Sequence, residues 1–290
     1  MHVFNRDFSY LEMTERIGYF SVFGGYTDMA ALHRYESLTE NIRHNILERY
    51  EELHEAFTYS SDTQTQNDLE TLLFRIAVGD RKSHSIYKND ITRPRGKELY
   101  RLLYEQQVIS KEYSRESLPN IPRRYLKKEL RRYQIEDKIL FQDNFTRFWF
   151  TFIVPWQDAI QKGDFSDVEA QIARELDKFI SFTFENLSNE LIRKHFAGES
   201  VIETGSYWDK NIELDLLAKT GKGTVIVGEC KWKNQRISKN ILTKLQKKCE
   251  RGNINPDYYA LFSKSGFSNE LRKQKTENLL LFDLEAFQTL

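Results

Sequence analysis

Four charged residues interrupt two neighbouring apolar stretches near the C-terminus. The stretch "IELDLLA" carries Glu213 and Asp215, and "TVIVGECKWK", which follows a Gly-containing turn, carries Glu229 and Lys231. Two apolar runs on either side of a short polar turn predict a β-hairpin. Because strand side chains alternate between faces, Glu229 and Lys231 share one face, and Cys230 between them points the other way. Charged side chains are seldom buried without a partner or a metal ion, so this pattern indicates a chemical role.

Phosphodiester hydrolysis is the chemistry that these groups favour. It needs a divalent cation that neutralises the phosphate and lowers the pKa of an attacking water. Magnesium takes a few carboxylate oxygens and keeps several waters. Asp215 and Glu229, with a backbone carbonyl of the second strand, would supply such a half-shell for Mg²⁺ or Mn²⁺, and Lys231 would hold the attacking water or the oxyanion. The alternative is a solvated hairpin with cross-strand ion pairs.

This stretch resembles the PD-(D/E)xK nuclease superfamily, in which one strand gives Asp and the next gives Glu-x-Lys. The upstream segment "FENLSNELIRKHF" resembles that family's helix, and Glu185 stands where its glutamate completes the metal site. The likeness is to Holliday-junction-resolvase-like and Mrr-like endonucleases. It is closer to the nuclease-like C-terminal region of archaeal-type AAA+ ATPases, through "ELDLLA" and "GECKW", over about residues 180–290. "GGYTDMAAL" and "NFTRFWFTFI" extend a looser likeness to the winged-helix part of those ATPases.

The ATPase half of the resembled proteins has no counterpart in this sequence. A P-loop requires G-x-x-x-x-G-K-[ST], and neither Gly96-Lys97 nor Gly221-Lys222 is followed by Ser or Thr. We therefore expect no ATP hydrolysis by this chain itself, and an ATPase partner acting in trans stays open.

Composition bounds the class of protein. Lys and Arg together number 43, as do Asp and Glu, so a nucleic-acid surface must come from local charge segregation. The two cysteines form neither a disulfide framework nor a zinc pattern, which suits a reducing compartment. The longest apolar window, "FWFTFIVPW", is too short to span a bilayer. These features predict a cytoplasmic protein without a membrane segment.

The elements that must position the candidate site follow from periodicity. We expect a helical segment over 1–60, in which Ser37 and Glu40 form a capping box. Three short helices and a two-stranded wing predict a winged-helix-like domain over 61–147, with the second helix in "KSHSIYKND" and strands in "VISKEYS" and "RYQIEDKIL". A helical connector over 148–178 leads into a restriction-endonuclease-like α/β domain over 179–290. The predicted fold class is therefore α+β and multidomain.

A second signal is a local excess of positive charge. Residues 93–132 hold twelve Lys or Arg against five Asp or Glu. Such cations contact phosphates without reading sequence, although a solvated charged face would look the same. Gln246, in the basic stretch "KLQKK", is a further candidate for phosphate contact. The predicted DNA-binding residues are Arg93, Arg95, Lys97, Arg123, Arg124, Lys127, Lys128 and Gln246.

The sequence as a whole predicts a metal-dependent DNA endonuclease. Asp215, Glu229 and Glu185 would bind Mg²⁺ or Mn²⁺, and Lys231 would position the water. The alternative is a non-catalytic DNA-binding or adaptor protein that uses a nuclease-like domain as a scaffold. A homodimer, and DNA against RNA as the substrate, stay open.

Overall fold

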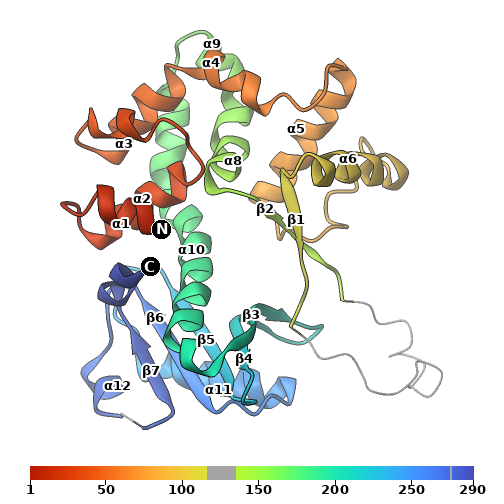
Figure 1. Ribbon diagram of the computed structural model, residues 1–290. Helices are drawn as coiled ribbons and strands as arrows, with labels where there is room; N and C mark the ends of the chain where they lie inside the picture. The colour runs from red at the N-terminus through yellow and green to blue at the C-terminus, as the bar shows by residue number, and fades with distance from the viewer. Residues whose placement is uncertain (116–134, 275) are drawn as a thin grey trace. The chain divides into compact units, whose positions relative to one another are not determined.

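The computed structural model describes residues 1–115, 135–274 and 276–290 (Figure 1). The described residues divide into two compact units. One combines Met1–Thr14 and Ile180–Leu290 with Ser114 and Arg115, and we call it the sheet unit. The other combines Glu15–Tyr113 and Glu136–Phe179, and we call it the helical unit.

The sheet unit is built on a mixed five-stranded sheet. Its strands, in the spatial order β3-β4-β5-β6-β7, are Val201–Trp208 (β3), Glu213–Thr220 (β4), Val225–Lys231 (β5), Tyr258–Ser263 (β6) and Leu279–Phe282 (β7). The first three strands pair antiparallel, and β5, β6 and β7 are parallel. The parallel strands need crossover helices, which are Lys239–Gly252 (α11) and Asn269–Lys273 (α12).

The predicted β-hairpin is formed by β4 and β5, which are the second and third of the five strands in this sheet. Its register pairs Leu216 with Gly228 and Lys219 with Val225. Gly223 takes a φ of +89° in the connecting turn, a conformation that residues with a side chain rarely adopt. The two apolar runs and the glycine turn therefore form the hairpin that brings the charged residues to one end of it.

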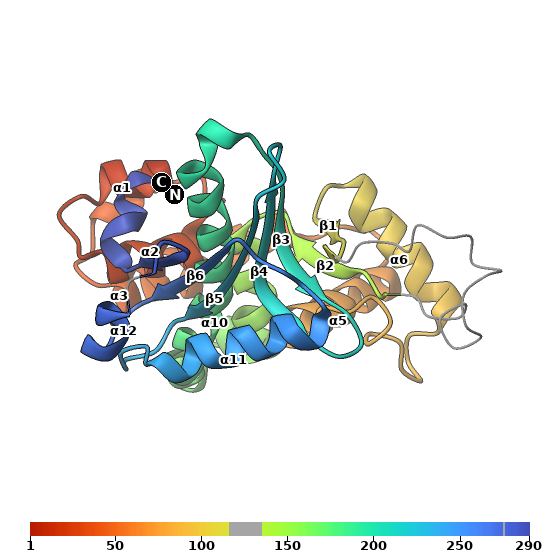
Figure 2. The same cartoon turned by 90° about the horizontal axis from the view of Figure 1, so that it is seen from below.

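Helices cover both faces of the sheet. On one face α11 buries Leu242, Leu245 and Cys249 against Leu217 and neighbouring apolar residues (Figure 2). Their spacing follows the helical repeat, so the helix presents one apolar side to the sheet.

The other face is covered by the second half of Ser166–His195 (α10), where the Phe184 ring lies 5.2 Å from that of Trp232 and 4.9 Å from that of Phe287. Acidic residues in the first turn of α10 and basic residues in its last turn complement the helix dipole.

The N-terminal helix belongs to the sheet unit. The side-chain amide of Asn5, in His2–Asp7 (α1), donates to the carbonyl oxygens of Phe287 and Leu290 at 3.0 and 3.2 Å. These acceptors lie in and after the final 3₁₀ turn, Leu284–Thr289 (η8). The start of the chain thus stabilises its end, which the sequence pattern gave no means to predict.

The helical unit consists of helices and one small two-stranded sheet. Its helices, one of which begins at the boundary with the sheet unit, are Met13–Phe23 (α2), Met29–His33 (η1), Leu38–Ile42 (α3), Arg43–Leu47 (η2), Tyr50–His54 (α4), Glu55–Phe57 (η3), Thr63–Val78 (α5), Arg93–Glu105 (α6), Asn144–Phe148 (α8), Trp149–Ile153 (η5), Val154–Trp156 (η6) and Gln157–Gln161 (α9). Its core is aromatic, with the Trp149 ring 4.3 Å from that of Phe57 and 5.5 Å from that of Tyr50. Stacked and edge-on rings of this kind add to the burial of apolar area.

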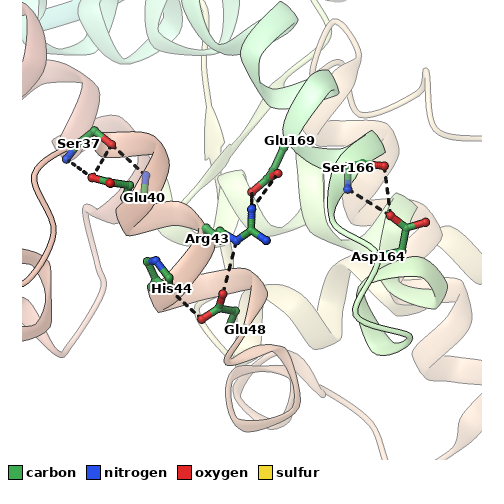
Figure 3. A network of polar contacts seen from close by, with 8 residues as sticks. All are labelled: Ser37, Glu40, Arg43, His44, Glu48, Asp164, Ser166 and Glu169. Carbon is green, nitrogen blue, oxygen red and sulfur yellow. Dashed lines mark hydrogen bonds and ion pairs between the residues drawn. The ribbon is translucent and has the colours of Figure 1, made fainter.

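A network of polar contacts lies on the surface of this unit (Figure 3). Ser37 and Glu40 form the predicted capping box at the start of α3. Arg43 contacts Glu48 at 3.5 Å and Glu169 of α10 at 3.2 Å. The arginine side chain is about half exposed, so these ion pairs add little stability.

The segment predicted as three helices and a wing forms only in part. The first and third helices are α5 and α6, and Ile109–Glu112 (β1) pairs antiparallel with Lys138–Phe141 (β2) as expected. The helix predicted in "KSHSIYKND" is wrong, because residues 83–86 form turns. Only Ile86 of this stretch is fully buried, so it offers too little apolar surface to stabilise a helix.

The five-stranded sheet of the sheet unit also contains a strand, β3, that the sequence pattern did not reveal. Strand β3 carries Gly205 and two register irregularities, and its side chains do not alternate cleanly between buried and exposed.

None of the helices in the described ranges is long and apolar enough to cross a membrane.

Candidate active site

Three charged side chains meet where the central hairpin ends. The ammonium nitrogen of Lys231 lies 2.7 Å from Glu229 Oε1 and 3.9 Å from Asp215 Oδ2. Asp215 Oδ2 also accepts a hydrogen bond of 2.8 Å from the backbone N–H of Cys230. The side chains of Asp215, Glu229 and Lys231 are 20%, 12% and 25% exposed. The structure therefore brings together, at a partly buried place, three of the four site residues that the sequence predicts, the fourth being Glu185.

Oxygen atoms from three residues surround the Lys231 ammonium group. Besides the two carboxylates, it donates to the backbone carbonyl oxygen of Cys230 at 3.0 Å. A backbone carbonyl of the second strand is one of the metal ligands predicted from the sequence. Asp215, Glu229 and the Cys230 carbonyl thus offer a converging set of oxygen acceptors to one cationic group.

A second lysine enters the site from α11. Lys248 Nζ lies 2.8 Å from Glu229 Oε2, so each oxygen of Glu229 contacts one ammonium group. Sequence reasoning chose Gln246 on this helix, but a side chain two residues away points to a different side. The signal that could have found Lys248 is its place next to Cys249 and three residues after Leu245, both of which face the sheet.

The electrostatics separate the two carboxylates. Burial, and then the negative charge of Glu229, raise the pKa of Asp215 to about 6. Burial also opposes ionisation of Glu229, but Lys231 and Lys248 outweigh it and hold the pKa of that carboxyl below its usual range. Burial lowers the pKa of Lys231, and the two carboxylates more than reverse this, so that its pKa lies above the ordinary value. Glu229 therefore stays ionised, and Asp215 is the group that takes up a proton first.

Helix α10 lies beside the hairpin through Asn189 and Ser188. The Asn189 amide donates to the carbonyl oxygen of Asp215 at 3.4 Å. Glu185 is one turn earlier on the same side of α10, and its backbone carbonyl accepts from Asn189 at 2.9 Å. Burial raises the pKa of the Cys230 thiol well above its usual value, followed by the charges of Asp215 and Glu185. Glu185 is therefore on the predicted helix, but the group on which its charge acts is the Cys230 thiol, which points away from Glu229 and Lys231.

The donor set fits a hard divalent cation with few protein ligands. In the described ranges, no three side chains of His, Cys, Asp or Glu gather closely enough to hold a metal ion. A site here would rely on the oxygens of Asp215 and Glu229, the Cys230 carbonyl and waters. Such a shell suits Mg²⁺ or Mn²⁺ rather than zinc, which prefers nitrogen and sulfur. An ion bound to these oxygens must displace the ammonium groups that now contact them.

Apart from Gln246, which lies on α11, the predicted DNA-binding residues fall into three groups. Arg95 is engaged within the helical unit, where it lies 2.8 Å from Asp68 and 3.4 Å from Glu98. Arg93 and Lys97 are exposed near the start of α6. The others in the cluster, Arg123, Arg124, Lys127 and Lys128, lie outside the described residues.

Comparison with known proteins gives a family model and a relative. Residues 149–246 match the DUF234 family, described as "Archaea bacterial proteins of unknown function". This range includes Asp215, Glu229 and Lys231 and ends two residues before Lys248. An uncharacterized protein of Methanocaldococcus jannaschii is 30% identical over 156 residues, which are 50% of this chain and 34% of that protein. The chain thus spans about a third of the length of this curated relative. No solved structure matches the chain.

Proposed function

We propose that this chain is a metal-dependent endonuclease that hydrolyses phosphodiester bonds of DNA, with a sheet unit of the PD-(D/E)xK type. The observation that carries the proposal is the convergence of Asp215, the Cys230 carbonyl, Glu229 and Lys231 at the end of a central β-hairpin. Burial and the charge of Glu229 raise the pKa of Asp215, and Lys231 and Lys248 lower that of Glu229 against the effect of burial. Perturbed pKa values of this kind are typical of catalytic sites.

Each residue has a role in this proposal. Asp215, Glu229 and the Cys230 carbonyl would hold Mg²⁺ or Mn²⁺ together with waters, whereas Glu185 of α10, the further ligand predicted from the sequence, does not gather with these two carboxylates in the described structure. When bound, the ion would supply charge neutralisation at the phosphate and a more acidic water. Lys231, displaced from these three oxygens by the ion but on the same strand face as Glu229, would orient the attacking water or stabilise the oxyanion through its ammonium group.

The helical unit would contribute DNA binding. The order of α5, α6 and the antiparallel pair β1–β2 supports a winged-helix-like role for residues 61–147. The exposed cations Arg93 and Lys97 near the start of α6 support contact with phosphates there.

One observation favours a second candidate function. Both oxygens of Glu229 contact lysines, so the chain compensates its own carboxylate charge without a metal ion. A nuclease-like unit that keeps these pairs would serve as a scaffold in a DNA-binding or adaptor protein, working with an ATPase partner or as a homodimer.

A cleavage assay separates the two candidates. The purified chain is incubated with supercoiled, linear and branched DNA in Mg²⁺, Mn²⁺ or EDTA. We expect cleavage that requires a metal ion, and its loss in Asp215→Ala and in Lys231→Ala. Glu213→Gln is the matched control, since Glu213 lies on the same strand but is exposed, and it should keep the parent's rate. Unchanged nicking in Asp215→Ala or Lys231→Ala would remove the catalytic assignment, and no cleavage by the parent on any DNA would favour the scaffold.

A further inference from the structure

Two loops at the carboxyl ends of β5 and β6 are joined into one surface beside the candidate active site. We call residues 232–238 and 264–268 the basic platform. The Lys264 N–H donates to the carbonyl oxygen of Lys231 at 3.1 Å, and Ser265 Oγ donates to that of Lys233 at 2.8 Å. Ile237 and Phe267 form a parallel β-bridge, and both are 3% exposed. The two loops are therefore fixed to each other and to the core.

The fixed geometry has further supports. The Ile237 N–H donates to the carbonyl oxygen of Gly266 at 2.9 Å, and Ser263 Oγ reaches the same oxygen at 2.8 Å. Gly266 has a φ of +74°, which glycine allows at low cost. The ammonium group of Lys264 lies 4.8 Å from the centre of the Trp232 ring, within the range of a cation–π contact. A rigid backbone of this kind presents its side chains in defined positions.

The platform carries positive charge alone. It contains Lys233, Arg236 and Lys264 and no Asp or Glu, in a chain whose formal net charge is zero. Lys233 and Arg236 are exposed, and Lys264 is half-buried. The next acidic side chain along the second loop, Glu270, lies 3.9 Å from Lys239 and so compensates a different cation. Charge segregation of this kind attracts a polyanion.

We propose that the basic platform binds the phosphodiester backbone of DNA and so places a phosphate beside Lys231. This inference rests on the proposed nuclease function, because the platform begins one residue after Lys231 at the same end of the sheet. Ligands of sheets with parallel strands bind at the carboxyl ends of those strands, which is where both loops lie. Sequence reasoning placed DNA binding only at residues 93–132 and at Gln246, and missed this surface.

Fluorescence anisotropy with a labelled DNA duplex tests the proposal, using the full chain in EDTA so that cleavage cannot intervene. The variant Lys233→Gln/Arg236→Gln/Lys264→Gln removes up to three phosphate contacts. Each lost contact makes the slope of log affinity against log salt shallower by about 0.9, so we expect a change of about 2.7 and a loss of affinity of roughly tenfold or more at low salt. The double variant Lys233→Gln/Arg236→Gln keeps Lys264 and its contact with Trp232. Its slope should become shallower by about two thirds of that change.

The matched control for the double variant is Lys222→Gln/Arg251→Gln, which leaves the stretch "KLQKK" unchanged. It removes the same charge from exposed positions of the same unit, in the hairpin turn and on the outer side of α11. We expect it to bind DNA almost as the parent does.

Three results would overturn the proposal: no DNA binding by the parent, equal losses in the platform and control variants, or binding of poly-glutamate competitor to the platform as tight as that of DNA. If instead the platform variant alone loses binding while the parent cleaves no DNA, the surface stands and the nuclease function fails.

Discussion

Replacing Asp215 with Asn should stabilise the sheet unit above about pH 6 and change little near pH 4. Burial and the charge of Glu229 raise the pKa of Asp215 from an ordinary 3.8 to about 6. The folded state therefore binds this proton more tightly than the unfolded chain does. The resulting stability is fully present below pH 3.8 and is lost as the pH rises through about 6.

The size of the effect follows from this interval. The difference between 3.8 and about 6 corresponds to roughly 3 kcal/mol, and it already includes the attraction between Asp215 and Lys231. Asn is neutral at every pH and keeps an oxygen that can accept from the Cys230 N–H. The expected gain is thus up to about 3 kcal/mol at pH 8, where the parent buries a charged carboxylate.

Amide hydrogen exchange of β4 and β5 measures this gain, with parent and variant compared at the same pH. Glu213→Gln is the control, because Glu213 is exposed on the same strand and its replacement should change stability by no more than about 0.5 kcal/mol. An Asp215→Asn protein that is no more stable than the parent at pH 8 would refute the reasoning, as would a gain of equal size near pH 4.

Two further variants test other contacts. Lys248→Met keeps the apolar stem and removes the ammonium group that contacts Glu229. We expect the affinity for Mn²⁺, measured by calorimetry, to rise by roughly tenfold or more. Weaker binding of Mn²⁺ would show that Lys248 does not compete with the ion. Arg95→Ala should weaken the packing of α6 on α5 by about 1–3 kcal/mol, because the guanidinium group contacts Asp68. Hydrogen exchange of α5 and α6 measures this loss, Lys97→Ala on the exposed side of α6 is the control, and equal protection in both proteins would contradict the structural role of Arg95.

The sequence identifies the central part of the site because its signals are local. The apolar runs of β4 and β5 and the glycine turn between them predict the hairpin, and the alternation of strand faces then places Glu229 and Lys231 on one face. The α/β domain predicted over 179–290 forms around this hairpin, and α11, β6 and β7 follow it in the chain.

What the sequence does not reveal depends on tertiary contacts. Lys248 reaches Glu229 because α11 packs at one particular rotation on the sheet, and "KLQKK" alone does not say which cation faces inward. The basic platform needs β5 and β6 to be neighbours, which brings together loops about thirty residues apart. Asn5 contacts the last residues of the chain, a separation over which no periodic pattern acts.

The most direct test of the central claim is a crystal structure of the chain grown with Mn²⁺, with anomalous scattering recorded to locate the ion. The account predicts a single strong anomalous peak within bonding distance of the carboxylates of Asp215 and Glu229 and of the Cys230 carbonyl oxygen, with Lys248 turned away from Glu229. An anomalous map without a peak among these oxygens, and with both lysines still on Glu229, would contradict it.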